Sequence, residues 1–303
     1  MKKRIVIAGG SGFIGKAISN HYLSKDYDVV VLTRGKTELK HNIKYKNWDA
    51  QFQGDWIKYI DGAELVVNLT GKSVNCRYTD ENKALILSSR VNATKVLGEV
   101  IRQVDNPPKL WINSSTATIY DYSLTKPMTE ENGDIGNDFS MSVATAWEKA
   151  FFESETPKTR KVALRISLVL GKNEGVLPVL TKLTKLGLGG YHGNGKQKFA
   201  WIHIADVLGI IDFVQENNIE GAINCTTDTT INNKQFMQAL RKSLGVSFGL
   251  PTPTFALKLG AMIMGTESEL ILKSRFVKPQ RLLDKGYQFK FTDINEALMD
   301  LKN

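Results

Sequence analysis

The sequence predicts an α/β protein with a doubly wound parallel sheet and a smaller C-terminal substrate lobe. Short β-branched segments alternate with longer amphipathic segments over the first two thirds of the chain. A glycine-rich turn follows the first of these short segments, and the regular alternation ends after Gly171. Strands and helices that alternate in this way form a parallel sheet with helices on both faces, which is a Rossmann-type arrangement.

The elements can be assigned in chain order. Buried strands are predicted over residues 4–8, 28–33, 64–69, 109–114, 161–170 and 201–204. Helices are predicted over residues 12–24, 79–104, 138–153, 207–215, 232–244, 253–264 and 293–301. Asp206 is expected to cap the helix over 207–215, because a carboxylate accepts an unpaired backbone N–H.

Two units are expected. Residues 1–170 with 201–225 would form the sheet domain, and residues 171–200 with 226–303 the smaller lobe. This lobe would close over the carboxyl ends of the strands, where open α/β sheets bind ligands. The glycines between residues 187 and 195 predict a mobile loop that exposes its backbone.

Composition narrows the class of protein. Of 303 residues, 42% are hydrophobic and 23% charged, which are ordinary globular values and exclude a disordered or fibrous chain. The net charge of +9 fits either an anionic partner or a basic solvated surface. The dispersed lysines argue against nucleic-acid binding, and the four histidines have no metal-ligand spacing. With two cysteines and no apolar run long enough for a signal peptide or a membrane span, we expect a cytoplasmic protein.

The glycine-rich turn is the strongest functional motif. It lies between a predicted strand and a predicted helix, as a dinucleotide-binding turn requires. An early glycine permits the tight turn, Gly12 lets a pyrophosphate approach, and Gly15 allows close helix packing. The alternative is a tight turn with no ligand. The expected cofactor-binding residues of this turn are Gly9, Ser11, Gly12, Phe13, Ile14 and Gly15.

The end of the second predicted strand favours NADP(H) over NAD(H). NAD-binding chains usually carry a carboxylate about 20 residues after the turn, for the ribose hydroxyls. Thr33 and Arg34 stand there instead, and a guanidinium pairs with a 2′-phosphate. The alternative for Arg34 is an exposed arginine at a strand end.

Further motifs resemble the extended short-chain dehydrogenase/reductase family, which includes nucleotide-sugar epimerases and dehydratases. They are Asn68-Leu69-Thr70-Gly71, Asn92-Ala93-Thr94, the segment from Ser114 to Tyr120 and the segment from Arg165 to Gly171. The resemblance implies that Asn68, Leu69, Thr70 and Gly71 lie beside the adenine and ribose of the cofactor.

A finer resemblance points to an atypical NAD(P)-dependent epimerase/dehydratase-like subgroup, also called cell-division-inhibitor-like. Its features span most of the chain, and Arg90 among them is expected to bind the cofactor. They are Leu32-Thr33-Arg34, Ser89-Arg90, Trp147-Glu148, Gly193-Asn194-Gly195-Lys196-Gln197, Trp201-Ile202-His203, Lys278-Pro279-Gln280-Arg281-Leu282 and Gly286-Tyr287-Gln288-Phe289. The resemblance is compatible with a homodimer.

The chain departs from the wider family at the catalytic pair. That family places Tyr-x-x-x-Lys at the start of a helix, where the lysine helps the tyrosine to exchange a proton. If Glu148 matches a glutamate that follows this motif, Ser140 and Ala144 occupy the two catalytic positions. The spacing does occur at Tyr122 and Lys126, but Pro127 disfavours a helix there, so we expect a chance match and no effect of a Tyr122 substitution.

The remaining catalytic candidates are Thr116 and Ser115, which would position a substrate oxygen, and Tyr120, the nearest phenol. A packed aromatic is the alternative for Tyr120, as a structural histidine is for His203. Lys196 and Lys198 could meet a nucleotide diphosphate or lie in solvent. We therefore expect an NADP(H)-dependent epimerase- or reductase-like protein acting on a small anionic or nucleotide-linked substrate. The alternative is a non-catalytic, NADP(H)-responsive binding protein.

Overall fold

The computed structural model describes residues 2–172, 174–263 and 273–302. The predicted ranges also include residues 1, 173, 264–272 and 303, which lie outside the described residues. Eight strands form the main sheet in the order β12-β7-β6-β5-β1-β2-β4-β3. All neighbours pair in parallel except β3 and β4. The strands are β1 (Arg4–Ala8), β2 (Asp28–Thr33), β3 (Glu38–Lys40), β4 (Ile43–Asn47), β5 (Leu65–Asn68), β6 (Leu110–Thr116), β7 (Arg160–Ile166) and β12 (Gly221–Cys225). The predicted α/β class is confirmed.

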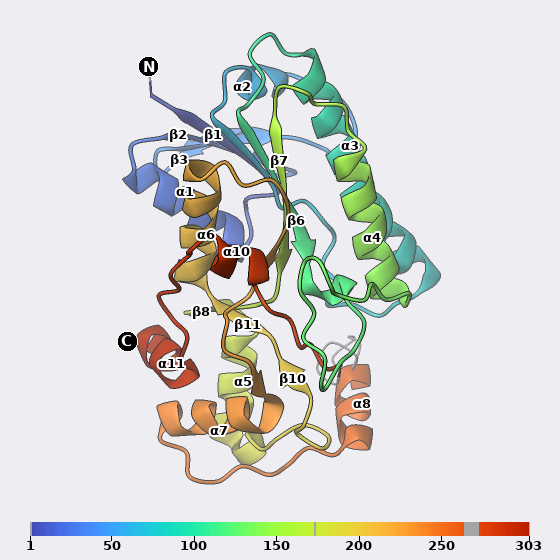
Figure 1. Cartoon of the computed structure of the whole chain (residues 1–303), viewed down its shortest axis with the longest axis vertical. Coiled ribbons are helices and arrows are strands. Elements are labelled where there is room, and N and C mark those ends of the chain that lie inside the picture. Colours follow the sequence, from blue (N-terminus) through green and yellow to red (C-terminus); the bar gives the residue numbers. More distant parts are fainter. Residues whose placement is uncertain (1, 173, 264–272, 303) are drawn as a thin grey trace.

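Helices cover both faces of this sheet (Figure 1). On one face lie α1 (Phe13–Ser24) and α6 (Ile204–Glu216), and on the other α2 (Ile57–Ile60), α3 (Asp80–Gln103) and α4 (Phe139–Phe152). Alternate strand residues face the two layers. Ile5 and Ile7 of β1 belong to the core beneath α1 and α6, whereas Val6 and Ala8 belong to the core beneath α3.

Side-chain caps set the starts of the long helices. The Thr79 hydroxyl accepts the Asn82 N–H at the start of α3, and an Asp138 carboxylate oxygen accepts the Met141 N–H at the start of α4. Each bond satisfies one of the unpaired N–H groups at a helix start. Helices α3 and α4 lie side by side against the sheet.

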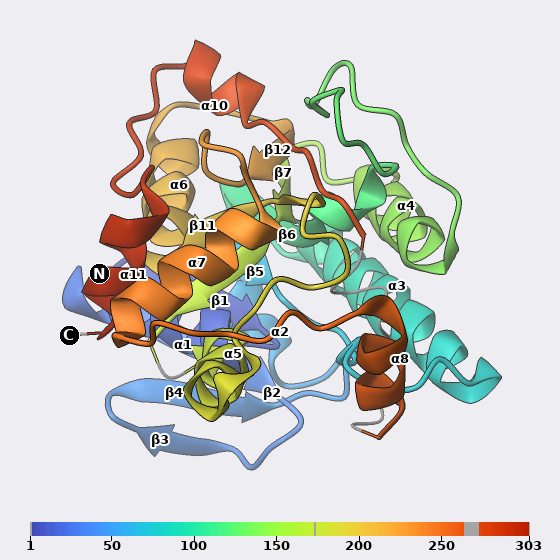
Figure 2. The same ribbon diagram turned by 90° about the horizontal axis from the view of Figure 1, so that it is seen from below.

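A second group of elements lies below the carboxyl ends of the main strands (Figures 1 and 2). The elements of this C-terminal part are β8 (Leu168–Gly171), β9 (Glu174–Gly175), α5 (Leu177–Leu183), η2 (Thr184–Leu188), β10 (Lys198–Phe199), β11 (Trp201–His203), β13 (Ile231–Asn232), α7 (Asn233–Leu244), α8 (Thr254–Ile263), α10 (Gln280–Asp284) and α11 (Ile294–Lys302). Residues of β8, α5, β11, β13, α7 and α11 share a core that contains Trp201, Phe236 and Leu298, whereas Leu282 of α10 belongs to the core beneath α1 and α6.

The strand predicted over 161–170 is two strands. The Ser167 N–H and hydroxyl both bond to the Cys225 carbonyl oxygen, at 3.0 and 3.1 Å, and end the pairing in the main sheet. The chain then continues as β8, which pairs with β11 in a separate three-stranded sheet. The predicted strand over 201–204 likewise ends at His203, because Ile204 begins α6.

The predicted cap of α6 is wrong. His203 is the N-cap, since its Nδ1 accepts the Ala205 N–H at 3.1 Å. Asp206 is buried in the first turn, and its carboxylate accepts the N–H groups of Lys290 and Phe291 at 2.6 and 3.0 Å. The carboxylate therefore holds the C-terminal segment against α6.

The segment over 187–195 does not expose its backbone as predicted. The N–H groups of Gly190 and Gly193 donate to the carbonyls of Leu250 and Thr252. In return, the N–H groups of these two residues donate to Gly187 and Tyr191. The backbone groups of these two extended segments therefore hydrogen-bond to one another. Within the described ranges, no helix has the length and apolar character needed to span a membrane.

Candidate functional site

The turn after β1 and the end of β5 meet at the switch point of the main sheet. The chain continues from β1 to β2 on one side, and β5 leads to β6 on the other, so the two carboxyl ends leave a crevice between them. Gly9 has a φ of +71°, and a Cβ on it would lie 2.8 Å from the Thr70 Cα. The predicted residues of the turn and of the β5 end are thus adjacent.

The glycines of the turn have different environments. Gly12 is the N-cap of α1, is exposed, and would place a Cβ in open space with no atom within 4 Å. A Cβ on buried Gly15 would lie 2.4 Å from the Gly10 Cα and carbonyl oxygen, so Gly15 allows α1 to seat on the turn itself. The first turn of α1 holds no acidic residue and points its amides toward the space beside Gly12.

The other members of the predicted turn contribute packing and access. Ser11 is exposed beside Gly12. Phe13 and Ile14 are partly buried against the core under α1, and the Phe13 ring lies where a Cβ on Gly171 would be, 2.1 Å from its nearest atom. This ring therefore connects the turn to the end of β8.

Thr33 ends β2, the neighbour of β1, and Arg34 follows it. The Thr33 hydroxyl accepts the Gly35 N–H at 3.3 Å, and the Asn47 side-chain amide donates to the carbonyls of Arg34 and Gly35 at 3.2 and 2.9 Å. These contacts fix the backbone of the connection, while the Arg34 side chain is exposed. Arg34 thus follows the carboxyl end of β2, the strand that pairs with β1.

Asn68 anchors the β5 end. Its side-chain amide donates to Asn113 at 2.7 Å and Thr94 at 3.2 Å, and its oxygen accepts the Thr70 N–H at 3.0 Å. The Trp147 indole N–H also donates to Thr94, at 3.0 Å. This buried network holds the backbone of Leu69 and Thr70 in place.

Two polar groups at the β5 end lack the partners that burial would demand. Among the described residues the buried Thr70 hydroxyl oxygen has no hydrogen-bond partner. The Arg90 guanidinium donates to the carbonyl oxygens of Lys72 and Ile86, at 3.0 and 2.9 Å, and lies 5.1 Å from the Trp147 ring centroid. Burial lowers the pKa of Arg90 to about 10, and no carboxylate in the described part of the chain pairs with it. Gly71 makes room for this group, since a Cβ there would lie 2.9 Å from the Arg90 Cζ.

Two of the three catalytic candidates are committed to a buried ion-pair network. The Ser115 hydroxyl donates to Glu148 at 2.6 Å, and Arg165 donates to both oxygens of the same carboxylate at 2.8 and 2.7 Å. Arg165 also donates to the Tyr120 hydroxyl at 2.6 Å, and Tyr120 donates to Asn224 at 2.9 Å. Ser115 and Tyr120 are 3% and 0% exposed, so the structure withdraws both from direct contact with a substrate. Sequence reasoning missed Arg165, although a charge inside an apolar strand pattern is itself a signal of a buried ion pair.

Thr116 remains partly exposed at the end of β6. Its hydroxyl oxygen accepts the Thr118 N–H at 3.1 Å and caps the short helix η1 (Ala117–Ile119). Ala144, at the position expected for a catalytic lysine, is 1% exposed and packs among Ala117, Ile119 and Tyr120. Ser140 lies in the first turn of α4.

The Tyr122…Lys126 spacing does not bring these two side chains together. Lys126 pairs with Asp134 at 2.6 Å, whereas the Tyr122 hydroxyl donates to Asp138, the N-cap of α4. Lys273 pairs with the same Asp138 oxygen, and its ammonium lies 5.1 Å from the Tyr122 ring centroid. Neither Asp138 nor Lys273 was among the predicted site residues.

His203 is buried, whereas Lys196 and Lys198 are exposed and partly exposed. His203 is 2% exposed, caps α6, and has its pKa lowered by burial against an opposing influence of Asp300. Lys196 is exposed, and the Lys198 ammonium lies 4.9 Å from the Phe276 ring centroid. His203 is thus a buried structural residue.

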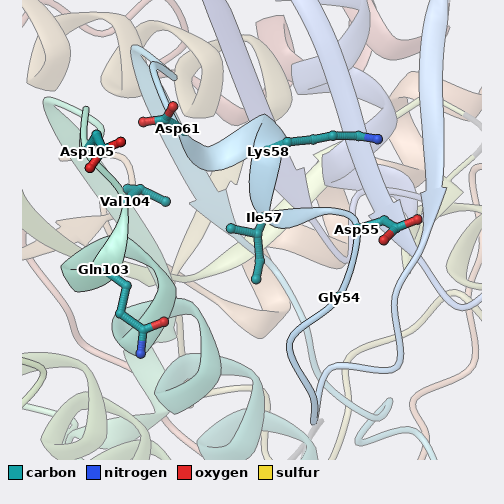
Figure 3. A pocket seen from close by; sticks show the side chains of 8 residues that line it. All are labelled: Gly54, Asp55, Ile57, Lys58, Asp61, Gln103, Val104 and Asp105. Carbon is teal, nitrogen blue, oxygen red and sulfur yellow. The ribbon is translucent and has the colours of Figure 1, made fainter.

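A cavity lies at the opposite end of the sheet (Figure 3). It has a volume of about 530 Å³ and is lined by Asp55, Lys58, Asp61 and Asp105, around the segments that lead into β5 and β6. Cofactor crevices of parallel sheets lie at the carboxyl ends of the strands. We therefore assign the site to the switch point and not to this cavity.

Comparison with known proteins is consistent with that choice. Residues 5–225 match the NAD dependent epimerase/dehydratase family, and residues 252–301 match a domain of unknown function, DUF1731. Epimerase family protein YfhF of Bacillus subtilis is 32% identical over 301 residues, covering 98% of this chain and 97% of that protein.

The fold is shared with solved structures. The human epimerase family protein SDR39U1 (isoform 2), solved with NADPH, superposes with a TM-score of 0.88 at 28% identity and covers 98% of each chain. UDP-N-acetylglucosamine 4-epimerase of Bacillus cereus shares the fold, with a TM-score of 0.77 at 15% identity, and covers 99% of this chain and 95% of that one. The family match and the likeness to SDR39U1 support an epimerase- or oxidoreductase-like role. From the first strand to the end of β12, this chain belongs to the NAD dependent epimerase/dehydratase family.

Proposed function

We propose that this protein binds NADP(H) across the carboxyl ends of β2, β1, β5 and β6, and acts on a small anionic or nucleotide-linked substrate. Residues 1–170 with 201–225 would hold the cofactor, and residues 171–200 with 226–303 would bind the substrate. We place this soluble activity in the cytoplasm, where the free thiols of Cys76 and Cys225 remain reduced.

The observation that carries the proposal is the cradle at the switch point. Gly12 opens space at the amino end of α1, where amides and the helix dipole favour a pyrophosphate. On the β5 side, the buried Thr70 hydroxyl has no hydrogen-bond partner among the described residues, and no described carboxylate pairs with the Arg90 guanidinium. An anionic, polar ligand would satisfy both groups. These residues fit an adenine dinucleotide, and a relative of 28% identity was solved with NADPH.

Arg34 supplies the preference for NADPH. Its exposed guanidinium can pair with a 2′-phosphate, which NADH lacks. Once bound, the nicotinamide supplies hydride transfer, while the residues of the β6 end orient the substrate. Thr116 is the residue that we expect to position the reacting oxygen directly. Ser115 and Tyr120 act behind it by holding the β6 end against α4 and β7.

Nucleotide-linked substrates are supported by the net charge of +9 and by the fold. A protein of the same fold at 15% identity, MoeE5, was solved with UDP-glucuronic acid and NAD. The alternative, a non-catalytic NADP(H)-responsive protein, is favoured by Ser140 and by the buried Ala144, neither of which can act as the family pair does.

Calorimetry with NADPH and NADH tests the cofactor assignment. Arg34→Ala should weaken NADPH binding by about ten- to a hundredfold, the range of a charged hydrogen bond, and leave NADH binding unchanged. Lys36→Ala, an exposed cation in the same connection, is the matched control. An unchanged preference for NADPH in Arg34→Ala would show that this residue does not read the 2′-phosphate.

Screening nucleoside diphosphate sugars and small anionic carbonyl compounds for NADPH oxidation tests the reaction. Turnover by the native protein that disappears in Gly12→Asp, where a carboxylate repels the pyrophosphate, supports an enzyme. Tight NADPH binding without turnover, together with a protein partner recovered only in the presence of NADPH, supports the binding protein.

A further inference from the structure

Transfer of a hydride to a carbonyl requires a proton for the carbonyl oxygen, and the described site has no obvious donor at Ser140 or Ala144. A serine hydroxyl is a poor acid near neutral pH, and an alanine has no proton to give. Tyr120, the phenol nearest to β6, is fully buried and occupied by Arg165 and Asn224. An accessible acid near the start of α4 would supply this proton.

Tyr122 meets that requirement. Its side chain is 46% exposed, and its hydroxyl donates to Asp138, the residue that caps α4. Phe139, the first residue of α4, packs edge-on against Tyr78 from the connection after β5, with ring centroids 4.9 Å apart. The start of α4 thus lies between the segments that follow β5 and β6, on the carboxyl edge of the sheet.

Lys273 brings a cation to the same phenol from the C-terminal part. Its ammonium pairs with the same Asp138 oxygen that accepts the hydrogen bond from the Tyr122 hydroxyl. The ammonium also lies 5.1 Å from the centroid of the Tyr122 ring. The Arg275 guanidinium carbon lies 5.5 Å from the same ring centroid. The hydrogen bond to Asp138 and partial burial raise the pKa of Tyr122 above its ordinary value, and the Lys273 ammonium acts against that rise because an opposite charge stabilises the ionised phenol.

The segment that carries Lys273 is anchored to the rest of the site. The Ser274 hydroxyl donates to the Ser123 carbonyl at 2.6 Å, and the Lys198 N–H donates to Ser274 at 2.9 Å. The Met128 N–H donates to the Phe276 carbonyl, at 2.7 Å. These bonds join the connection after β6, strand β10 and the C-terminal segment, so Lys273 is positioned by the fold and not by chance on a free surface.

We propose that Tyr122 is the proton donor of this protein, with Lys273 and Asp138 as its positioning residues. This reverses the expectation from the sequence that a Tyr122 substitution has no effect, because the phenol meets Asp138 and Lys273 while Lys126 pairs with Asp134. This proposal rests on the proposed function, in which NADPH is the reductant. The carbonyl carbon takes the hydride and its electron pair from C4 of the nicotinamide, which leaves NADP⁺. The carbonyl oxygen takes the proton from the Tyr122 hydroxyl to give an alcohol. The phenolate that remains is stabilised by the Lys273 ammonium and recovers a proton from water, which reaches the exposed ring.

The test begins without any cofactor, by NMR of protein labelled with ¹³Cζ-tyrosine. The resonance lost in Tyr122→Phe identifies Tyr122, and its shift follows ionisation of the phenol with pH. Lys273→Met should raise the pKa of Tyr122, because the stabilising cation is gone, and Asp138→Asn should lower it while retaining the cap of α4. Lys126→Met is the matched control and should leave the titration unchanged. If Lys273→Met leaves the pKa of Tyr122 unchanged, or if Lys126→Met changes it, Lys273 is not the cation that acts on Tyr122 and the proposal is wrong.

The second readout uses NADPH with 9,10-phenanthrenequinone, an activated dicarbonyl that serves as a probe in place of the unidentified substrate. Tyr122→Phe should lower kcat by about a hundredfold or more, as expected for loss of a general acid, without weakening NADPH binding in calorimetry. Tyr59→Phe is the control. Tyr59 is a partly buried tyrosine that also lies near several cations, but at the opposite end of the sheet, so this variant should retain the native rate.

The outcomes distinguish failure of the proposed role of Tyr122 from failure of the proposed cofactor binding. Unchanged turnover in Tyr122→Phe, or NADPH binding without reduction of the probe by the native protein, overturns the role of Tyr122 and leaves cofactor binding intact. Absence of NADPH binding in the native protein overturns the proposed function and this role with it. Thermal unfolding of each variant confirms that an altered rate does not come from a loss of folded protein.

Discussion

Gly12 and Gly15 stand three residues apart in one turn, yet the structure assigns them different tasks. Gly15 faces the backbone of Gly10, so its missing side chain serves the packing of α1. Gly12 faces open space, so its missing side chain serves a ligand. A motif search treats both as equivalent letters of one pattern, and only the three-dimensional surroundings separate folding from binding.

Alanine at each position should therefore give opposite results. Gly12→Ala should unfold at the native temperature, because its φ of −84° and ψ of −176° suit alanine, but should lose most NADPH binding because the methyl group fills the approach to the pyrophosphate. Gly15→Ala should lower the free energy of unfolding by about 1–3 kcal/mol through overpacking. Thermal unfolding with and without NADPH measures both effects. Equal stability of the two variants would contradict this division.

Arg90 is a charged residue whose partner set is incomplete without a ligand. Its guanidinium is partly buried on carbonyl oxygens and an indole ring, and burial lowers its pKa. Arg90→Gln should reduce the rise in unfolding temperature that saturating NADPH produces, since binding energy appears as stability. Arg102→Gln, an exposed change on the same helix, should retain the full rise. A full rise in Arg90→Gln would place the cofactor elsewhere.

At the scale of elements, the Glu148–Arg165 pair joins α4 to β7 and, through Ser115, to β6. Glu148→Gln should lower the free energy of unfolding by about 3–5 kcal/mol, because it leaves a buried guanidinium without its counter-charge. Glu155→Gln removes the exposed pair with Arg102 and should cost less than about 1 kcal/mol. Urea unfolding measures both values, and similar losses would show that the buried pair is no more than a surface contact.

His203 makes the start of α6 sensitive to pH. Burial lowers its pKa below that of the unfolded chain, so protonation favours unfolding, and its Nδ1 must stay unprotonated to accept the Ala205 N–H. Stability should therefore fall as the pH drops below the pKa of a free histidine, while above it the contribution is constant. His203→Asn keeps a cap that does not titrate and should show a smaller loss between pH 7 and pH 5. His41→Asn, at an exposed residue, is the control, and parallel pH profiles of native protein and His203→Asn would contradict the assignment.

Local patterns predicted the elements whose burial repeats along the chain. Strand β1 and the long helix α3 follow directly from apolar periodicity and capping residues. The hairpin of β3 and β4 escaped notice because β3 is fully exposed and carries no apolar alternation. The break at Ser167 has no glycine or proline to mark it, since a contact with Cys225 in a distant strand causes it. Asp206 looked like a cap because its partners lie more than 80 residues away.

At the scale of the whole molecule, the same distinction applies to the site. The cofactor residues fall in short motifs directly after β1, β2 and β5, so sequence spacing indicates them. The cluster of Tyr122, Asp138 and Lys273 joins residues separated by up to 151 positions, and its ion pair by 135. No local spacing encodes such a meeting, which depends on how the C-terminal segment packs against the sheet domain.

We propose that an adenine coenzyme binds at the switch point of the main sheet. The amino end of α1 lies on one side of this site, and Arg34 and Arg90 lie on the others. Titration calorimetry of the folded native protein with NADPH and with NADH tests this most directly. The account predicts one NADPH site per chain, with tighter binding than for NADH. No heat of binding with either coenzyme, from protein shown to be folded by its thermal transition, would contradict it.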